Sequence, residues 1–409
     1  MIDITRTVNK MDYRAIMTDG NLLLKGLQKA TRGSMWKESS QRGLLHALKM
    51  IFNISDELYN RTYKCDKLST FTIHERGRLR VIDSYNVRDR TIRHVLCDDI
   101  YDDLIRPKLI YDNGASLKGR GISHSRKRFE THLRKYYMNH HNNKGYILFS
   151  DFSKYYDNIL QVVAKDQLLS LVDYDEYMDW LLTTIFKTFE INVDGLDSDA
   201  IDNLYNGIIN KLSFNPIKTE SCKTIKKSIS IGDQLSQHIG IYYPHSIDDY
   251  IKIVKSQKYY GRYMDDFYIM SNSREELLDL LDSIISIGLD LGLHVNRQKT
   301  YIVRMDSVYK YLQIKYQLTS SGKIIKRINP KRVTSLRIRL KKLKSKVDYG
   351  IVDYNNVENM FKSWMGSYNK LLSNKQRSNL ISLYESLYNC HIEVYKNKMY
   401  IIREEILNV

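Results

Sequence analysis

The stretch Tyr259–Met270, YYGRYMDDFYIM, places two adjacent aspartates, Asp265 and Asp266, between two short hydrophobic runs. This pattern predicts a tight β-hairpin that carries both carboxylates at its turn. A second apolar strand, Tyr146–Phe149, leads in the same way to Asp151. Like charges brought together repel one another unless a cation is bound, and oxygen-only ligands suit Mg²⁺. An Asp-Asp pair alone is more often a solvated turn, so the surrounding sequence decides the interpretation.

Further motifs stand in a fixed order around these aspartates. They are GRLRVIDSYNVRDR (Gly77–Arg90), DFSKYYD (Asp151–Asp157), IGDQLSQ (Ile231–Gln237), GLHVNRQKT (Gly292–Thr300) and YKYLQIKY (Tyr309–Tyr316). With YMDD at Tyr263–Asp266, this order resembles that of the reverse transcriptases over about residues 70–370. The resemblance implies an α+β right-hand polymerase fold, with fingers, a palm built on an antiparallel sheet, and a helical thumb.

The resemblance implies that the catalytic residues are Asp151, Asp265, Asp266 and Lys299. Asp151 and Asp265 would bind two Mg²⁺ ions, with Mn²⁺ as a substitute, and would be assisted by Asp266 and the backbone carbonyl of Phe152. Lys299 would protonate the leaving pyrophosphate. The alternative for Lys299 is a surface lysine that neutralises phosphate charge.

The same resemblance implies a nucleotide site. Arg80 and Arg78 would clamp the triphosphate through charge-assisted hydrogen bonds, and Gly232 and Gln237 would lie along the incoming nucleotide. Tyr156 would be a steric gate that favours dNTPs over rNTPs, with an ordinary core tyrosine as the alternative. The residues of the primer grip would be Tyr311, Leu312 and Gln313, and Gln313 stands where glycine is usual, which puts the geometry of that turn in question.

The chain has 409 residues, and 64 Lys+Arg against 47 Asp+Glu give a formal charge of +17. A basic excess of this size indicates a polyanion partner, most often nucleic acid. Two basic blocks, Lys118–Lys135 and Lys323–Val347, would hold the template–primer duplex, with solvated helix faces as the alternative. The expected contact residues are Lys118, Arg120, Arg126, Arg128, Arg337, Lys341 and Lys344.

Two positions depart from the common reverse transcriptase pattern, since Ile231 replaces a glutamine and Gln237 replaces a proline. This form resembles enzymes of diversity-generating retroelements and of the bacterial "unknown group", many of which are associated with phage defence. The leading hypothesis is an RNA-directed DNA polymerase that copies a dedicated noncoding RNA in antiphage defence. The alternatives are a retroelement enzyme that makes mutagenised cDNA, a non-catalytic RNA-binding scaffold, and untemplated or protein-primed synthesis.

The expected organisation is fingers at residues 1–145, palm at 146–318 and thumb at 319–409. An acidic helical insertion, about residues 158–215, would contact a partner protein or a second copy. Helices are expected over residues 1–60, 86–110 and 273–291 and through the last 60 residues, and the chain after Tyr316 leaves no room for a nuclease domain. Four widely spaced cysteines make a disulfide framework or zinc site improbable. With no apolar targeting or membrane-spanning segment evident, a bacterial cytoplasmic location is expected.

Overall fold

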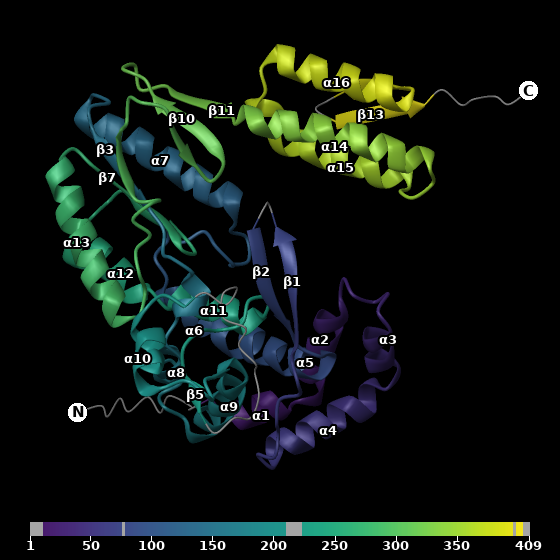
Figure 1. The fold of residues 1–409 in the computed structure, drawn as a ribbon, viewed down its shortest axis with the longest axis vertical. Helices are drawn as coiled ribbons and strands as arrows, with labels where there is room; N and C mark the ends of the chain where they lie inside the picture. The colour runs from purple at the N-terminus through teal and green to yellow at the C-terminus, as the bar shows by residue number, and fades with distance from the viewer. Residues whose placement is uncertain (1–10, 76–77, 210–222, 396–397, 404–409) are drawn as a thin grey trace, which may run out of the picture. The chain divides into compact units, whose positions relative to one another are not determined.

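The N-terminal part of the chain is helical and is followed by one long hairpin. The computed structural model describes residues 11–75, 78–209, 223–395 and 398–403 (Figure 1). The first elements are α1 (Tyr13–Thr18), α2 (Gly20–Thr31), α3 (Glu38–Leu45), α4 (Ala47–Tyr59), β1 (Ser69–Glu75), β2 (Arg78–Ser84), α5 (Val87–Val95) and α6 (Asp102–Ile105). A π-helical segment, Leu96–Tyr101, joins α5 to α6. The expected helices are confirmed for the described part of residues 1–60 and for residues 86–110. Between them, β1 and β2 pair antiparallel.

A four-stranded sheet has its strands in the order β6-β7-β3-β8. Its strands are β3 (Tyr146–Ser150), β6 (Tyr260–Tyr263), β7 (Asp266–Ser271) and β8 (Tyr301–Arg304). Residues of β3 and β7 are buried on both faces, which explains their nearly continuous apolar sequence. On one face, α13 (Arg274–Asp290) packs against β7 and β3. From α7 (Ile122–His140), the ring of Phe129 meets Tyr268 edge-on at 4.8 Å.

The first two helices of the acidic stretch are part of the main hydrophobic core, to which they contribute Leu168, Met178 and Leu181 among others. Its elements are α8 (Gln161–Ser170), α9 (Glu176–Phe186), β4 (Ile191–Asn192), α10 (Ser198–Asn206) and β5 (Thr224–Ile225). A small apolar cluster of Ile191, Val193, Ile209 and Ile225 holds the β4–β5 pair and α10 together. Residues 210–222 of the predicted insertion lie outside the described residues. The chain then continues through α11 (Gln234–Tyr242) and α12 (His245–Asp249).

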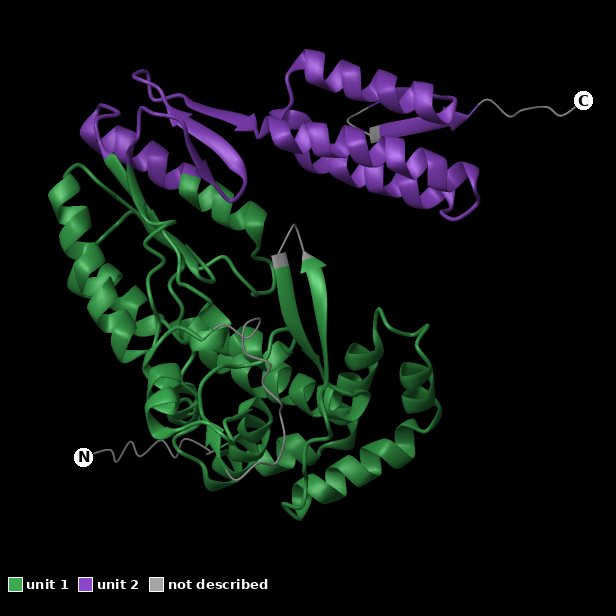
Figure 2. Ribbon diagram, in the orientation of Figure 1, with its two compact units in different colours: residues 1–129, 146–302 green, residues 130–145, 303–409 purple. Residues whose placement is uncertain are grey.

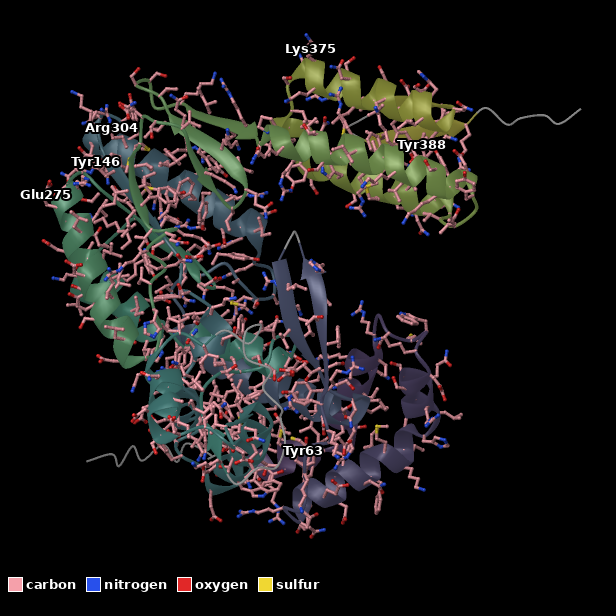
Figure 3. The ribbon with its side chains drawn as sticks, in the orientation of Figure 1. Tyr63, Tyr146, Glu275, Arg304, Lys375 and Tyr388 are labelled. Atoms are coloured by element: carbon pink, nitrogen blue, oxygen red, sulfur yellow. The ribbon has the colours of Figure 1, made fainter. Side chains whose placement is uncertain are left out.

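The C-terminal part combines a three-stranded sheet, a helical bundle and a final hairpin. Its elements are β9 (Tyr309–Tyr311), β10 (Ile314–Leu318), β11 (Ile324–Ile328), α14 (Pro330–Asp348), α15 (Tyr354–Tyr368), α16 (Asn374–Tyr388), β12 (Cys390–Tyr395) and β13 (Lys398–Arg403). The bundle has its own core, where the Tyr388 hydroxyl donates a hydrogen bond to the Leu340 carbonyl at 3.0 Å (Figure 3).

Two features of the C-terminal part differ from the sequence-based expectation. The last 60 residues are not all helical, because β12 and β13 pair as a hairpin. The basic block also begins as a strand: Ile324, Ile325 and Ile328 are β-branched and favour β11, and the helix starts only at Pro330, capped by Asn329.

The chain divides into two compact units (Figure 2). Unit 1 comprises residues 1–129 and 146–302, and unit 2 comprises residues 130–145 and 303–409. The expected division into fingers, palm and thumb is a functional one and stays a prediction.

Three further observations concern the start of α13, the cysteines and the hydrophobicity of the helices. Ser273 caps α13 by accepting a hydrogen bond from the Glu276 amide at 3.1 Å, but the Glu276 carboxylate bonds Ser271 and Gln257 rather than closing a capping box. In the described part of the chain, the cysteines at 65, 97 and 390 are free. A search of the same residues finds no helix with the length and hydrophobicity needed to span a bilayer.

Candidate active site

The sheet brings Asp151 to the same end as the aspartate hairpin. Asp151 follows β3 directly, and β3 pairs antiparallel with β7 so that Ser150 lies opposite Phe267. In the hairpin, Tyr263 pairs with Asp266, which leaves Met264 and Asp265 as the two turn residues. The sequence-predicted arrangement is therefore present, with one adjustment: Asp266 is the exposed first residue of β7 rather than part of the turn.

The electrostatics of Asp265 show that these carboxylates interact. Burial raises the pKa of Asp265, and the charge of Asp151 raises it further. The positive charges of Lys299 and Arg80 act in the opposite direction. Lys299 forms an ion pair with the Oδ2 atom of Asp151. Two acids and two bases from four separate sequence motifs thus share one electrostatic site.

The donor set fits a divalent cation. Asp151 is 3% exposed, and its buried Oδ1 atom has no hydrogen-bond partner, so it is an available ligand atom. As the side chains stand, no group of three or more acidic, histidine or cysteine residues in the described ranges is arranged to hold a metal. Hard carboxylate oxygens with open positions for phosphate are what Mg²⁺ prefers. The ring of Phe152 is buried in the core, and its backbone bridges to Val295.

A buried ion pair between Arg262 and Asp248 holds the aspartate hairpin in place. The guanidinium of Arg262, 1% exposed, donates to both carboxylate oxygens of Asp248, with Nε–Oδ1 at 2.9 Å and Nη2–Oδ2 at 2.6 Å. Its Nη1 donates to the carbonyl of Met264 at 3.1 Å, and its Nη2 donates to the carbonyl of Ile241 at 2.8 Å. The turn peptide just before Asp265 is therefore tied to α11 and α12.

Tyr156 lies beside the turn of the aspartate hairpin. Its hydroxyl donates to the Met264 sulfur at 3.8 Å. Burial raises the pKa of Tyr156, and the charge of Asp265 adds to this effect while Arg80 opposes it. The ring packs on Gly240 of α11 so closely that a Cβ there would lie 2.8 Å from the tyrosine oxygen. The half-buried ring thus lies between Gly240 on one side and Met264 of the aspartate hairpin on the other.

The nucleotide motif lies against the β1–β2 hairpin. Gly232 has φ +110°, and a Cβ there would lie 3.3 Å from the side chain of Ile82 on β2. The Asp83 amide donates to the carbonyl of Ile231 at 3.4 Å. Arg80 is exposed on β2 and acts electrostatically on both Asp265 and Tyr156. Its role as a triphosphate clamp stays a prediction. The side chain of Arg78 lies outside what the structure describes.

The remaining residue that is predicted to contact the nucleotide lies on the helix that follows. Gln237 is exposed on α11. The neighbouring His238 is buried, with Nε2 at 2.7 Å from Asp102 Oδ1 and Nδ1 at 3.0 Å from the carbonyl of Gln234. Arg93 of α5 donates to Asp233 at 3.0 Å, where both side chains are almost fully buried. These pairs fix α11 against α5 and α6.

Comparison with known proteins fits this geometry. Residues 67–316 match the family model described as "Reverse transcriptase (RNA-dependent DNA polymerase)". The chain belongs to this reverse transcriptase family. The matched residues hold every motif quoted above and end at Tyr316, the last residue of the primer-grip motif. A comparison with curated proteins finds no match.

Solved structures similar to this reverse transcriptase include two telomerases. Telomerase from Candida albicans, solved with a fragment of telomeric RNA, is 13% identical with a TM-score of 0.41, and the match covers 78% of this chain and 58% of that one. An apo telomerase from Candida tropicalis, truncated from its C-terminal domain, is 12% identical with a TM-score of 0.40, and the match covers 63% and 54%. The chain thus spans little more than half the length of these telomerases.

The residues predicted to form the primer grip lie in the β9–β10 hairpin in unit 2. Tyr311 pairs with Ile314, and the turn residues Leu312 and Gln313 have φ +40° and +74°. Two left-handed residues are typical of a type I′ turn, so the hairpin keeps its geometry with glutamine in place of glycine. The role in gripping a primer stays a prediction.

The predicted nucleic-acid contacts of the first basic block divide into two kinds. Lys118 is exposed in a loop, and Arg126 lies on α7. In contrast, Arg120 donates to the Asn113 carbonyl at 2.8 Å, and Arg128 binds Asp112 at 2.6 Å. Arg120 and Arg128 therefore stabilise the fold itself, which the sequence did not indicate, and their contact with nucleic acid stays a prediction.

The second basic block presents its predicted residues on α14. Arg337 and Lys341 are exposed, and Lys344 is half-buried beside Asp348, with which it forms an ion pair. The three share one face of the helix, as their spacing predicts. Duplex binding by this face is likewise a prediction.

Sequence reasoning missed several residues that shape the site. Arg262, only three residues before Asp265, could have been suspected from its position inside an apolar strand. Its partner Asp248, the glycine at 240 and the His238–Asp102 pair depend on packing between distant segments, for which the sequence offers no spacing signal.

Proposed function

We propose that this chain is an RNA-directed DNA polymerase that adds dNTPs to a primer 3′-hydroxyl with two divalent metal ions, Mg²⁺ in the first place. The observation that carries the proposal is the convergence of Asp151 and Asp265 at one end of the sheet, with one buried carboxylate oxygen open for a ligand. Family membership supports the same reaction.

In this proposal, Asp151 and Asp265 hold the metal ions, with Asp266 and the Phe152 carbonyl as supporting ligands. Bound metal ions would lower the pKa of the attacking hydroxyl and neutralise the leaving pyrophosphate. The chain's own residues prepare the site for this role: Arg262 fixes the turn, and Lys299 compensates the Asp151 charge.

The nucleotide is proposed to lie between Arg80 and α11. Arg80 would bind the triphosphate by charge-assisted hydrogen bonds. The ring of Tyr156, immobilised between Gly240 and Met264, would stand against the ribose 2′ position and exclude rNTPs. The Lys299 side chain is 44% exposed and attached by a flexible stem, so it can turn from Asp151 toward phosphate and donate a proton there.

Primer extension on an RNA template tests the catalytic assignment. Asp151→Asn and Asp265→Asn are each expected to lower the rate at least 1,000-fold, while Asp290→Asn, at an exposed position of α13, is a matched control with unchanged rate. Wild-type chain that binds RNA but extends no primer in Mg²⁺ or Mn²⁺ would instead support the alternative of a non-catalytic scaffold.

We further propose that the template is a dedicated noncoding RNA and that the enzyme acts in bacterial antiphage defence in the cytoplasm. The sequence departures at Ile231 and Gln237 support this. The same departures favour, as the alternative, a diversity-generating retroelement enzyme. Sequencing the RNA and cDNA that copurify with the protein separates the two: one recurrent RNA with a faithful copy supports defence, and cDNA with scattered substitutions supports diversity generation.

A further inference from the structure

A cluster of basic and aromatic side chains surrounds Tyr111, in the loop that precedes α7. Tyr111 is 61% exposed. The guanidinium carbons of Arg128 and Arg120 lie over its ring, 4.7 Å and 5.3 Å from the ring centre. The ring of His124 meets it edge-on, with the two ring centres 5.9 Å apart. We call these four residues the Tyr111 cluster. Guanidinium groups are attracted to the face of an aromatic ring, so the two arginines hold an exposed ring in place.

The backbone that carries Tyr111 is fixed to strand β6. The Arg262 amide donates a hydrogen bond to the Asp112 carbonyl at 3.2 Å, and the Gly114 amide donates to the Arg262 carbonyl at 3.1 Å. Arg262 is also the residue whose side chain holds the aspartate hairpin. Tyr111 is therefore attached to the same strand as the candidate catalytic turn, although it belongs to none of the motifs assigned to catalysis.

The two arginines of the Tyr111 cluster are fixed by hydrogen bonds of their own. Arg128 Nε donates to Asp112 Oδ1 at 2.6 Å, and Arg120 Nη1 donates to the Asn113 carbonyl at 2.8 Å. Side chains that are already ordered lose less conformational entropy when a ligand binds. The cluster is thus preorganised, which a binding surface needs and an ordinary solvated arginine does not.

The charges around Tyr111 suit a polyanion. Residues 106–128 contain seven Lys or Arg side chains and a single acid, Asp112. On neighbouring elements, Lys252 binds this acid at 3.1 Å, and Asp249 adds one further negative charge. Positive side chains therefore exceed acids by eight to two. An exposed aromatic ring within a basic surface is the pattern that binds single-stranded nucleic acid, because bases stack on the ring while Lys and Arg attract the phosphates.

The ring can accept only an unpaired base, since the bases of a duplex are already stacked on one another. Of the strands that a polymerase handles, the template ahead of the primer end is unpaired. We propose that Tyr111 is a stacking site for an unpaired base of the RNA template, and that Arg120 and Arg128 attract the adjacent phosphates. This assignment rests on the proposed polymerase function, which supplies the single-stranded template.

Fluorescence anisotropy with the full chain tests the stacking site in the absence of dNTPs, so that binding is measured without catalysis. The probe is a labelled RNA–DNA hybrid whose RNA strand extends past the primer 3′ end. Tyr111→Ala should weaken its binding about 10-fold through the loss of one stacked base, and Tyr111→Phe, which keeps the ring, should bind as the wild type does. Tyr174→Ala, at a tyrosine 59% exposed between two aspartates, is the matched control with unchanged affinity.

Two further hybrids identify the strand that is bound. A blunt hybrid, and a hybrid in which the DNA strand overhangs instead, should each bind equally to the wild type and to Tyr111→Ala. Equal binding of the blunt hybrid also verifies that the variant is folded. The dependence of affinity on salt should be the same for both proteins, because the substitution removes no charge. An RNA overhang that contains 4-thiouridine should crosslink, on irradiation, to the peptide that carries Tyr111.

The proposal is overturned if Tyr111→Ala binds the RNA overhang as tightly as the wild type, if it loses the blunt hybrid to the same extent, or if the crosslink forms elsewhere. It is also overturned if the wild type binds the RNA-overhang hybrid no more tightly than the blunt one. A wild type that shows the expected binding but extends no primer would count against the proposed polymerase function alone. Primer extension with unchanged binding by Tyr111→Ala would count against the stacking site alone.

Discussion

The aspartate hairpin β6–β7 and the primer-grip hairpin β9–β10 both turn through two residues without glycine. In the aspartate hairpin, Met264 alone has a left-handed backbone, with φ +57°, and its carbonyl is bonded to the buried Arg262. In the primer-grip hairpin, both turn residues are left-handed, and the turn is supported by the three-stranded sheet β11-β10-β9. The first turn is thus fixed by a charge network, and the second by strand pairing.

This difference suggests which substitutions each turn tolerates. Left-handed non-glycine residues cost about 1–3 kcal/mol and persist only where their surroundings determine them. At the aspartate hairpin, the surroundings are polar and specific, so a lost partner should disturb the chemistry. At the primer-grip hairpin, the hydrogen bonds between paired strands hold the turn. A substitution that relieves the backbone strain of its left-handed residues should therefore only raise stability.

The largest loss of stability is expected when Arg262 is replaced. Arg262→Met leaves the Asp248 carboxylate buried without its partner, so the free energy of unfolding should fall by about 3–5 kcal/mol. Denaturant unfolding measures this loss. Primer extension, measured where the variant is still folded, should fall more than tenfold because the Met264 carbonyl is released.

A double variant separates folding from positioning. Arg262→Met with Asp248→Leu removes both buried charges and should recover most of the stability, but not the activity. Full recovery of primer extension would contradict a positioning role for Arg262. Breaking the exposed Arg304–Asp306 pair with Arg304→Met is the control, with less than about 1 kcal/mol expected.

The next effect is expected where Tyr156 packs on α11. Gly240→Ala places a Cβ 2.8 Å from the tyrosine oxygen, so the ring must shift, at a cost of about 1–3 kcal/mol in stability. Discrimination against rNTPs, measured by single-nucleotide insertion, should weaken. Tyr156→Phe removes the clashing oxygen and should restore the stability of Gly240→Ala. Gly366→Ala on α15, where a Cβ meets nothing within 4 Å, is a control without loss of stability.

The sequence predicted which acidic and basic side chains come together better than it predicted the contacts that hold them in place. Asp151, Asp265, Lys299 and Arg80 each stand in a motif whose order implies convergence, and the structure brings them into one electrostatic site. Arg262–Asp248 joins residues 14 positions apart through a buried contact that no periodicity encodes.

The C-terminal hairpin was missed for a different reason. The alternating pattern of CHIEVYKNKMYIIR (residues 390–403) is a strand signal, whereas the prediction extended helix through the last 60 residues. The structural role of Arg120 and Arg128 was also hidden, because a basic residue that bonds a carbonyl or a buried acid looks the same in sequence as one that faces solvent.

A smaller, pH-dependent effect is expected at His238, on the helix that adjoins the aspartate hairpin. Burial lowers the pKa of His238, but the nearby Cys97 and the bonds to Asp102 and Gln234 outweigh it and raise the pKa to about 11. A histidine whose pKa is raised by folding stabilises the folded protein. This contribution is fully present at pH values below the ordinary histidine pKa of about 6.5, and it is lost as the pH rises toward 11.

His238→Gln should therefore cost about 1.5 kcal/mol at pH 6, and the deficit relative to the wild type should shrink as the pH rises. Urea unfolding at a series of pH values measures this difference. A deficit that does not change with pH would contradict a charged His238 in the folded protein.

The smallest effect is expected at the primer-grip turn, where the comparison of the two hairpins is most direct. Gln313→Gly removes the side-chain penalty at φ +74° and should raise the free energy of unfolding by about 1 kcal/mol, measured by denaturant unfolding. Met264→Gly relieves similar strain in the aspartate hairpin, but it also removes the sulfur that Tyr156 contacts. Its gain in stability should come with altered dNTP-over-rNTP selection, whereas Gln313→Gly should leave that selection unchanged. Equal effects of the two substitutions on selection would mean that the turns do not differ in the way their supports indicate.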